Sequence, residues 1–332
     1  FMIHKGTMWQ EILDILKEKA NSGLDVRVLY DDMGSFAMLP SNYPKLLEKY
    51  GIKCMQFNKL SPFAGIIMNN RDHRKMMIID GHTAFSGGIN ISDEYININS
   101  KLGVWKDNGI RIKGEAVWNF TVMFLEMWNS FKKEDNDYNK YKYNFTEKYK
   151  ENGFVVPYGE SPLDDVITGE DIYLNIINQA KKYVYIYTPY LIIDTDMINS
   201  LILAARRGVD VRIVVPGIPD KKIVYDLTSS YFYTLIKGGV KIYTYTNGFV
   251  HSKVFLSDDE IATVGTINLD YRSLYLHFEC GIYMKDTNVI KDIKKDFEDS
   301  FKESHKVDEK EAKNGLFKGL WQAILRLFAP MM

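Results

Sequence analysis

The pattern of apolar and polar positions predicts alternating helices and strands. Residues 7–22 place four apolar side chains on one face of a helix, those of Met8, Ile12, Ile15 and Leu16. Gly23 follows at the position where a glycine commonly ends a helix. Residues 25–30 (DVRVLY) are a short apolar run that is typical of a strand.

The same order of features returns later in the chain. Residues 196–207 predict a helix, Gly208 ends it, and residues 210–215 (DVRIVV) predict a strand, about 185 residues after the first such strand. A stronger repeat accompanies it, with identical residue types at offsets 0, +2, +7, +14 and +17: His73, Lys75, Asp80, Gly87 and Asn90, and then His251, Lys253, Asp258, Gly265 and Asn268. Five identities in one register indicate a tandem duplication.

The duplication predicts an α/β fold with two tandem halves, each a mixed β-sheet flanked by helices, packed as a pseudo-twofold pair. We expect the first half at residues 1–145, the second at residues 146–308 and a C-terminal amphipathic helix at residues 309–332. Residues 132–152, rich in Lys, Asn and Tyr, join the halves. This stretch is either a linker with a surface excursion or a solvated helix with a loop.

Charge and composition disfavour a nucleic-acid binder, a disulfide or zinc framework and a membrane span within this sequence. The formal net charge is −1, from 42 basic and 43 acidic residues, whereas a dedicated nucleic-acid binder is more often clearly basic. Cys54 and Cys280 are far apart, which disfavours a disulfide framework or a zinc site and fits a reducing compartment. No stretch reaches the roughly 18 apolar residues that a membrane span needs. Because residue 1 is Phe rather than Met, we expect a fragment or a processed form.

The two copies of the motif H-x-K-x4-D point to phosphoryl chemistry. In a strand, residues i and i+2 project to the same face, so His73 would lie beside Lys75, and His251 beside Lys253. An anion bound between the imidazole and the ammonium group would explain why the two side chains share one face. One neutral histidine could attack phosphorus and form a phosphohistidine. The other could donate a proton to the leaving alcohol and then deprotonate the incoming alcohol or water.

The remaining polar residues complete this hypothesis. Lys75, Lys253, Asn90 and Asn268 are expected to stabilise charge on the phosphoryl oxygens, so no metal and no cofactor are required. A metal site is disfavoured because lysine is a poor ligand and no Cys or carboxylate cluster accompanies either motif histidine in the sequence. Surface or packing roles are expected for the other four histidines, although His277 stays open because it is close to Glu279: His4, His82, His277 and His305.

Longer segments carry a family resemblance. They are YDDMGS (30–35), HRKMMIIDG (73–81), GGINISDEY (87–95), WKDNGIRIKGEAV (105–117), TPYLIID (188–194), GVDVRIVVPGIPDKK (208–222) and VGTINLDYRSLYLHFEC (264–280). With the duplicated motifs, they resemble the phospholipase D superfamily and, within it, bacterial cardiolipin synthases. The resemblance extends from about residue 5 to about residue 330 and implies two phospholipase D-like halves.

The resemblance also implies a reaction and roles for named residues. Two phosphatidylglycerol molecules would give cardiolipin and glycerol, with His73 as the nucleophile and His251 as the general acid and base. The family pairs each motif histidine with a downstream carboxylate, and the matching positions are Asp107 and Glu279. Asp80 and Asp258 complete the two catalytic motifs, where we expect them to fix the local structure rather than to do chemistry.

The same resemblance implies a place in the cell. Members of the family carry N-terminal transmembrane segments, which we expect in the full-length protein although they are absent from this sequence. The expected location is the cytoplasmic face of the cell membrane, and the expected partners are phosphatidylglycerol and an anionic membrane surface, with no nucleic acid. The oligomeric state cannot be derived from the sequence.

Residues 315–328 (GLFKGLWQAILRLF) predict an amphipathic helix with an interfacial character. One face carries Trp, Phe and Leu, and Lys318, Gln322 and Arg326 lie away from it. A helix docked on the core would have the same pattern. A lipid substrate favours membrane contact, through Leu316, Phe317, Leu320, Trp321, Ile324 and Phe328.

Three alternatives to the synthase hypothesis stay open. A phospholipase D-type nuclease shares the duplicated His/Lys chemistry but should show a basic groove and salt-dependent binding. A hydrolytic phospholipase D differs only in whether water or a lipid alcohol attacks, which depends on how dry the acceptor pocket is. A membrane-binding scaffold without activity is disfavoured because both motifs are intact.

Overall fold

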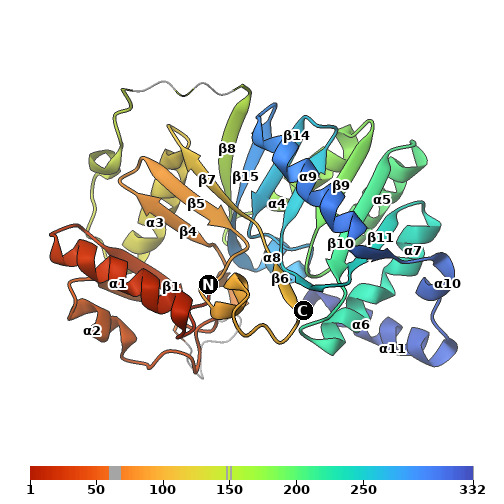
Figure 1. The fold of residues 1–332 in the computed structure, drawn as a ribbon, viewed down its shortest axis with the longest axis horizontal. Helices are drawn as coiled ribbons and strands as arrows, with labels where there is room; N and C mark the ends of the chain where they lie inside the picture. Colours follow the sequence, from red (N-terminus) through yellow and green to blue (C-terminus); the bar gives the residue numbers. More distant parts are fainter. Residues whose placement is uncertain (60–68, 147–148, 150–151, 332) are drawn as a thin grey trace.

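The computed structural model describes residues 1–59, 69–146, 149 and 152–331. The two repeats lie side by side in Figure 1, with the first half at the left and the second at the right. The first half contains α1 (Thr7–Asn21), β1 (Arg27–Asp31), α2 (Tyr43–Glu48), β2 (Lys53–Phe57), β3 (Arg71–Asp72), β4 (Met76–Ile79), β5 (Thr83–Gly87), η2 (Asp93–Ile96), β6 (Val104–Lys106), β7 (Gly109–Lys113), α3 (Val117–Phe131) and η3 (Tyr138–Tyr141).

The second half is larger and ends in short helices. It contains β8 (Phe154–Glu160), α4 (Thr168–Gln179), β9 (Tyr183–Tyr187), α5 (Thr195–Arg206), β10 (Asp210–Pro216), α6 (Lys222–Ser230), α7 (Phe232–Lys237), β11 (Lys241–Tyr245), β12 (Gly248–Val250), β13 (Val254–Ser257), β14 (Ile261–Gly265), α8 (Tyr271–Tyr275), β15 (His277–Lys285), α9 (Val289–Lys302), β16 (Ser304–Lys306), α10 (Glu309–Ala312), α11 (Leu316–Leu327) and η4 (Ala329–Met331).

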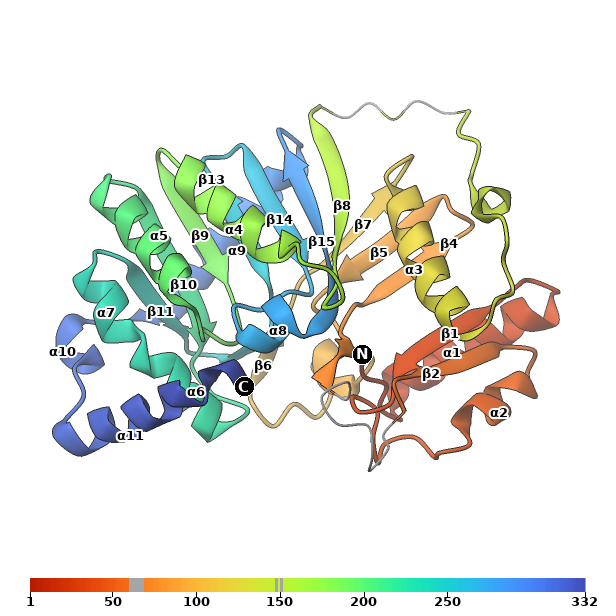
Figure 2. The same ribbon diagram turned by 180° about the vertical axis from the view of Figure 1, so that it is seen from behind.

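The second half is built on one mixed sheet. Its order is β16-β11-β10-β9-β13-β14-β15-β3, and β8 also pairs with β15. β9, β10 and β11 are parallel, whereas β13, β14 and β15 run antiparallel. Figure 1 shows α9 on one face of this sheet, and Figure 2 shows α4 and α5 on the other. The expected mixed sheet flanked by helices is therefore confirmed.

The first half repeats this plan in two separate sheets. β1 and β2 are parallel, like β10 and β11, and β4, β5 and β7 are antiparallel, like β13, β14 and β15. In the second half β9 joins the two sets of strands, and no strand among the described residues of the first half takes that place. The D-V-R repeat is confirmed, because it leads into β1 and β10.

Two short strand pairs connect the halves. β3 of the first half pairs in parallel with β15 of the second, with Arg71 opposite His277. β12 of the second half pairs in parallel with β6 of the first, with Gly248 opposite Val104. In each pair, the strand just before a motif histidine lies against a strand that leads to a carboxylate of the other half. The pseudo-twofold arrangement therefore brings the two motifs to one interface.

One local prediction needs correction, and one choice between alternatives is decided. The first helix is present as α1, but it buries Trp9 and Leu13, whereas Ile15 on the predicted apolar face is 55% exposed. The joining stretch is an irregular excursion with the short helix η3, and Arg27 binds Asp135 at its start (2.6 Å). Its residues 147–148 and 150–151 lie outside the described part of the chain.

Candidate active site

His73 is held by the second half. Because β3 pairs with β15, the backbone N–H of His73 donates to the carbonyl of Phe278 (2.9 Å). Its ring Nδ1 then lies 2.8 Å from Oε1 of Glu279. Thr266 donates its hydroxyl to the other oxygen of this carboxylate. Glu279 is fully buried, so its orientation is fixed by these partners.

His251 is held in the same way by the first half. Its backbone N–H donates to the carbonyl of Lys106 (2.7 Å), and its Nδ1 lies 2.7 Å from Oδ2 of Asp107. The approach of this carboxylate depends on Gly88, because a Cβ there would lie 2.1 Å from Oδ1 of Asp107. The expected pairing with the downstream carboxylate of the same half is wrong for both histidines, because His73 binds Glu279 and His251 binds Asp107. The pairing crosses between halves because the interfacial strand pairs cross.

These contacts determine the tautomer of both rings. A carboxylate only accepts hydrogen bonds, so Nδ1 of each imidazole carries the proton that is donated to it. The lone pair is then on Nε2 of His73 and of His251. This is the arrangement in which a neutral histidine can attack an electrophile or accept a proton.

The two lysines lie beside the histidines but precede the strands. β4 begins at Met76 and β13 at Val254, one residue after each lysine, so the prediction that the His–Lys pairs lie within a strand is wrong. Lys75 donates from Nζ to the carbonyl of His73 (2.6 Å). Lys253 donates to the carbonyl of His251, and its Nζ lies 2.8 Å from Nδ1 of that ring. Because Nδ1 already donates to Asp107, the carbonyl is the acceptor for Lys253.

Burial makes the charge state of the site unusual. Desolvation lowers the pKa of His73 well below its usual value, and desolvation together with the charge of Lys253 lowers the pKa of His251 to about 4. Desolvation also lowers the pKa of Lys75 to about 8 and that of Lys253 to about 7. The site therefore holds neutral imidazoles beside lysines that lose their protons readily.

The two carboxylates stay ionised. Burial alone would raise the pKa of Glu279, but the charge and the hydrogen bond of His73, together with the charge of Lys75, hold it well below its usual range. Burial alone would also raise the pKa of Asp107, but the charge and the hydrogen bond of His251 lower it below its usual value. Lys75 of the first half also lowers the pKa of His251 in the second. The two half-sites therefore act on each other electrostatically.

The paired asparagines occupy buried positions with free polar atoms. Asn90 donates to the hydroxyl of Tyr95 (2.6 Å), and its Oδ1 is buried without a partner among the described residues. Oδ1 of Asn268 is in the same situation within that part of the chain. Buried amide atoms are normally hydrogen-bonded, so both side chains have capacity for a ligand. The oxygen and nitrogen of each amide can exchange places by rotation of the side chain.

Asp258 has a structural position. Its carboxylate accepts backbone N–H groups of Lys181 (2.7 Å), Lys182 (2.8 Å) and Tyr183 (2.8 Å) at the start of β9. It lies in the turn between β13 and β14, at the end of β13 that is remote from His251. Asp80 and Asp258 share a left-handed backbone, with φ of 54° and 56°. These observations support the expectation that the motif aspartates fix the local structure.

Aromatic side chains enclose the ring of His251. Its centroid lies 5.2 Å from that of Tyr95, 5.8 Å from that of Trp105 and 6.1 Å from that of Phe249. In the other half-site, the ring centroid of His277 lies 5.5 Å from that of His73. Sequence reasoning did not assign these neighbours. The signal available for Trp105 and His277 is that each stands two residues before a carboxylate, in WKD and HFE.

The C-terminal helix α11 is docked through Gln322 and Arg326 of its polar side and through Leu325, which is buried in the core. Gln322 donates to the carbonyl of Asp226 (3.0 Å), and Arg326 donates to the hydroxyl of Ser230 (2.9 Å). Gln322 and Arg326 therefore lie away from the exposed apolar face, as predicted, and they contact the protein. The six residues predicted for membrane contact are all exposed, between 42% and 89%: Leu316, Phe317, Leu320, Trp321, Ile324 and Phe328.

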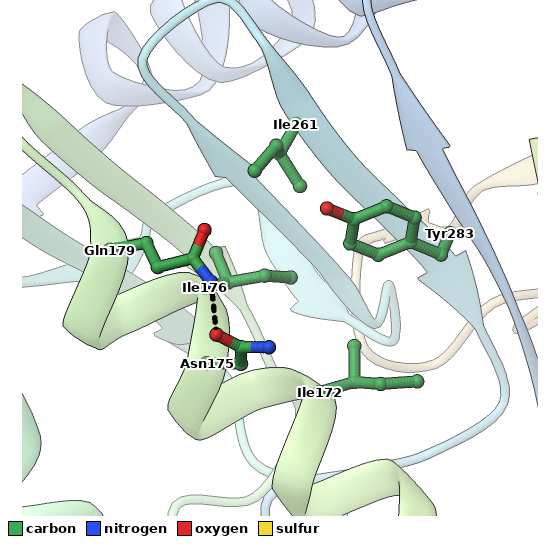
Figure 3. Close-up of a pocket in the computed structure, with 6 residues that line it drawn as sticks. All are labelled: Ile172, Asn175, Ile176, Gln179, Ile261 and Tyr283. Carbon is green, nitrogen blue, oxygen red and sulfur yellow. Dashed lines mark hydrogen bonds between the residues drawn. The ribbon is translucent and has the colours of Figure 1, made fainter. Parts of the chain in front are cut away.

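A hollow elsewhere in the second half does not belong to this site. It measures about 70 Å³ and lies between α4, β14 and β15, where Figure 3 shows Ile261, Tyr283 and the hydrogen-bonded pair Asn175 and Gln179. Ile261 begins β14, at the end of the sheet remote from His251.

Within the described ranges, no helix is long and apolar enough to cross a membrane.

Known proteins match this chain over most of its length. The family described as cardiolipin synthase, PLD-like domain, matches residues 4–128 and 173–301. An uncharacterized protein of Streptococcus mutans is 52% identical over 89% of the chain and 64% of its own length. Cardiolipin synthase 1 of Staphylococcus aureus is 41% identical over 86% of the chain and 58% of its own length. The chain thus spans about three fifths of these relatives.

Solved structures agree on the fold. Phosphatidylserine synthase from Haemophilus influenzae covers 99% of the chain and 86% of its own, with a TM-score of 0.70 and 17% identity. Polyphosphate kinase from Porphyromonas gingivalis covers 99% of the chain and 47% of its own, with a TM-score of 0.61 and 13% identity. With its two histidine motifs at the interface of two PLD-like halves, the chain belongs to the cardiolipin synthase family with PLD-like domains.

Proposed function

We propose that this protein transfers a phosphatidyl group from one phosphatidylglycerol to another, which gives cardiolipin and glycerol. The observation that carries this proposal is the crossed pair of buried imidazoles. Each has Nδ1 bound to a carboxylate of the other half, which leaves the lone pair on Nε2, and each lies next to a lysine. The identity to cardiolipin synthases supports the choice of substrate.

The first step makes a phosphohistidine. Nε2 of His73 attacks phosphorus, and the bond between phosphorus and the glycerol oxygen breaks. His251 donates its Nε2 proton to that oxygen, so glycerol leaves as the neutral alcohol. The negative phosphodiester favours the imidazolium of His251, because an opposite charge raises the pKa of a buried histidine. Asp107 supports the same cationic form through its hydrogen bond to Nδ1.

The second step regenerates the enzyme. The primary hydroxyl of the second phosphatidylglycerol attacks phosphorus, His251 takes up its proton, and the bond between phosphorus and Nε2 of His73 breaks. Cardiolipin is then released. The aromatic side chains around His251 and its low exposure of 7% support a lipid alcohol rather than water as the acceptor.

Cationic and amide groups hold the phosphoryl oxygens. Lys75 and Lys253 supply positive charge from both halves. The amides of Asn90 and Asn268, rotated so that their NH₂ groups replace the unpartnered oxygens, donate further hydrogen bonds. Binding of the phosphate anion favours the protonated form of both lysines. The chain's own residues therefore supply charge neutralisation, a nucleophile and an acid.

Helix α11 supports a membrane location. The helix is attached to α6 through Gln322 and Arg326 and buries Leu325 in the core, whereas the six apolar side chains predicted for membrane contact stay exposed. Burial of such a face in an anionic lipid surface is the arrangement of an interfacial helix, and Lys318 is exposed beside it. We assign this face to the cytoplasmic leaflet, with which the two free, buried cysteines are compatible.

The deciding experiment uses vesicles of labelled phosphatidylglycerol without added metal. Cardiolipin, phosphatidic acid and glycerol are followed, with His73→Ala and His251→Ala as comparison variants. Cardiolipin and glycerol in equal amounts, lost in both variants, are the expected result. With a labelled substrate that carries an activated leaving group, His251→Ala should still accumulate some covalently labelled protein, because such a group leaves without an acid. His73→Ala should accumulate none.

Two results would overturn the proposal in different ways. Phosphatidic acid as the main product would show that water is the acceptor and that the protein is a hydrolase. Cleavage of DNA with no lipid turnover, in a longer protein that also includes the segments present in the relatives, would show a nuclease. The same assay on the longer protein distinguishes an incorrect proposal from an incomplete chain.

A further inference from the structure

We propose that His73, Glu279 and His277 form a binding site for a transition-metal ion such as Zn²⁺, and that occupation of this site switches the enzyme off. The three residues come from β15 and from the segment after β3, and one ligand atom of each lies within 4.8 Å of the others. All three side chains are buried. Two imidazoles and one glutamate form a common donor set for zinc.

The position of His277 points to a ligand that the protein itself does not supply. Its Nδ1 is buried and has no hydrogen-bond partner among the described residues. It lies 3.7 Å from Oε1 of Glu279, which is too long for a hydrogen bond but close to the separation of two ligands on one tetrahedral zinc, about 3.4 Å for bonds near 2.0–2.1 Å. Nδ1 of His73 lies 2.8 Å from the same oxygen.

The surroundings already hold the glutamate in place. Thr266 donates to the oxygen of Glu279 that does not face the histidines. A hydrogen bond of this kind orients a metal-binding carboxylate. Lys75 is close by, and its charge opposes every further cation alike. The two imidazole ligands disfavour hard ions such as Mg²⁺ and Ca²⁺, which prefer oxygen ligands.

The other half-site lacks this set of ligands. Trp105 stands two residues before Asp107, in the place that His277 takes before Glu279. An indole nitrogen is a donor only and cannot bind a metal. The duplicated site therefore has one half that can accept Zn²⁺ and one that cannot.

The chemistry of inhibition follows from the tautomer of His73. A metal on Nδ1 replaces the proton that Nδ1 donates to Glu279, and this proton moves to Nε2, so the neutral ring keeps its proton count. Nε2 then has no lone pair for attack on phosphorus. The ion also occupies the carboxylate that orients the ring. Zn²⁺ should therefore block formation of the phosphohistidine. This expected inhibition rests on the proposed role of His73 as the nucleophile.

The test is a direct titration of the metal-free protein with Zn²⁺ by calorimetry in the absence of lipid, with Co²⁺ absorption as a second readout. We expect one ion per chain and the absorption of a tetrahedral N/O site. His277→Asn should weaken binding by at least about 100-fold, because even the loss of a residue outside the ligand set costs about 10–100-fold. His277→Gln provides a second variant if the first does not fold.

The chain provides a matched control. His305 binds Glu311 at the surface (2.9 Å), and His305→Asn removes an exposed histidine–carboxylate pair without touching the site. This variant should bind Zn²⁺ as the original does. Equal affinity in the original protein and both His277 variants, or equal losses in the His277 and His305 variants, would overturn the metal site. Because binding is measured without turnover, this result is independent of whether cardiolipin is made.

Discussion

Nδ1 of His251 lies 2.7 Å from Oδ2 of Asp107, a residue that precedes it by 144 positions and belongs to the other repeat. His73 and Glu279 form the reciprocal contact at 2.8 Å across 206 positions. Neither half therefore contains a complete catalytic pair. An active site assembled in this way forms only when the interface of the two halves forms, so its activity reports on their packing.

This relationship predicts a large effect of Asp107→Asn. The amide cannot support the imidazolium of His251 and favours the wrong tautomer, so we expect kcat for cardiolipin formation to fall by about 10³–10⁴-fold, by analogy with other histidine–carboxylate pairs. Steady-state kinetics on phosphatidylglycerol vesicles measure it. The double variant with His251→Ala should be no worse than His251→Ala alone, since residues that act as a unit are not additive. Additive losses would show that Asp107 acts elsewhere.

Lys253 predicts the alkaline limb of the pH profile. Burial lowers its pKa to about 7, so the substrate-free enzyme loses this cation as the pH rises through about 7. Because kcat/KM reports the free enzyme, we expect it to fall above that pH. The limb in kcat should lie at higher pH, since bound phosphate stabilises the ammonium.

The control for this pH effect is Lys253→Arg. A guanidinium keeps its charge throughout the accessible range, so the alkaline limb of kcat/KM should flatten even if the maximal rate is reduced. His73 must be neutral to attack phosphorus, and its lowered pKa places the limb of this group on the acid side. An unchanged alkaline limb in Lys253→Arg would assign that limb to another group.

Much of the site could be predicted from the motif spacing alone. Equal offsets in the two repeats identified both histidines, both lysines and both asparagines, because a duplicated fold places equivalent residues equivalently. The crossed carboxylates could not be derived in this way. Which histidine contacts Asp107 depends on the pairing of β12 with β6. These two strands are far apart in the sequence, and no periodic pattern of residues predicts that they pair.

Other parts of the fold were beyond sequence reasoning for related reasons. The apolar pattern of α11 identified a helix but not its orientation, which depends on hydrogen bonds from Gln322 and Arg326 to α6. His277 was considered beside Glu279, but its proximity to His73 arises only from the pairing of β15 with β3. Helical and strand periodicity describe one element at a time, whereas these features depend on two.

Asp258 predicts a separation of stability from catalysis. Its carboxylate accepts three backbone N–H groups at 2.7–2.8 Å, so Asp258→Ala should lower the free energy of unfolding by about 2–4 kcal/mol. Alanine is also strained at a φ of 56°, whereas Asp258→Asn tolerates this backbone and should lose less. Denaturant unfolding measures both. Turnover per folded molecule should stay near that of the unsubstituted protein, and a large loss of turnover without a loss of stability would give Asp258 a chemical role.

Helix α11 predicts how the protein binds lipid. Phe317→Ser with Leu320→Ser removes two exposed apolar side chains, 89% and 63% exposed, from the outward face of the helix. Full burial of such a side chain contributes about 1.5–3 kcal/mol, so the affinity for phosphatidylglycerol vesicles should fall by at least about tenfold even if burial in the lipid is partial. Phe154→Ser with Val156→Ser is the matched control, because these residues of β8 are also exposed apolar positions, at 51% and 44%. Sedimentation with vesicles measures all three proteins. If both double variants lose affinity equally, the membrane contact is not located on α11, whereas a loss confined to the α11 variant would place the lipid surface against this helix.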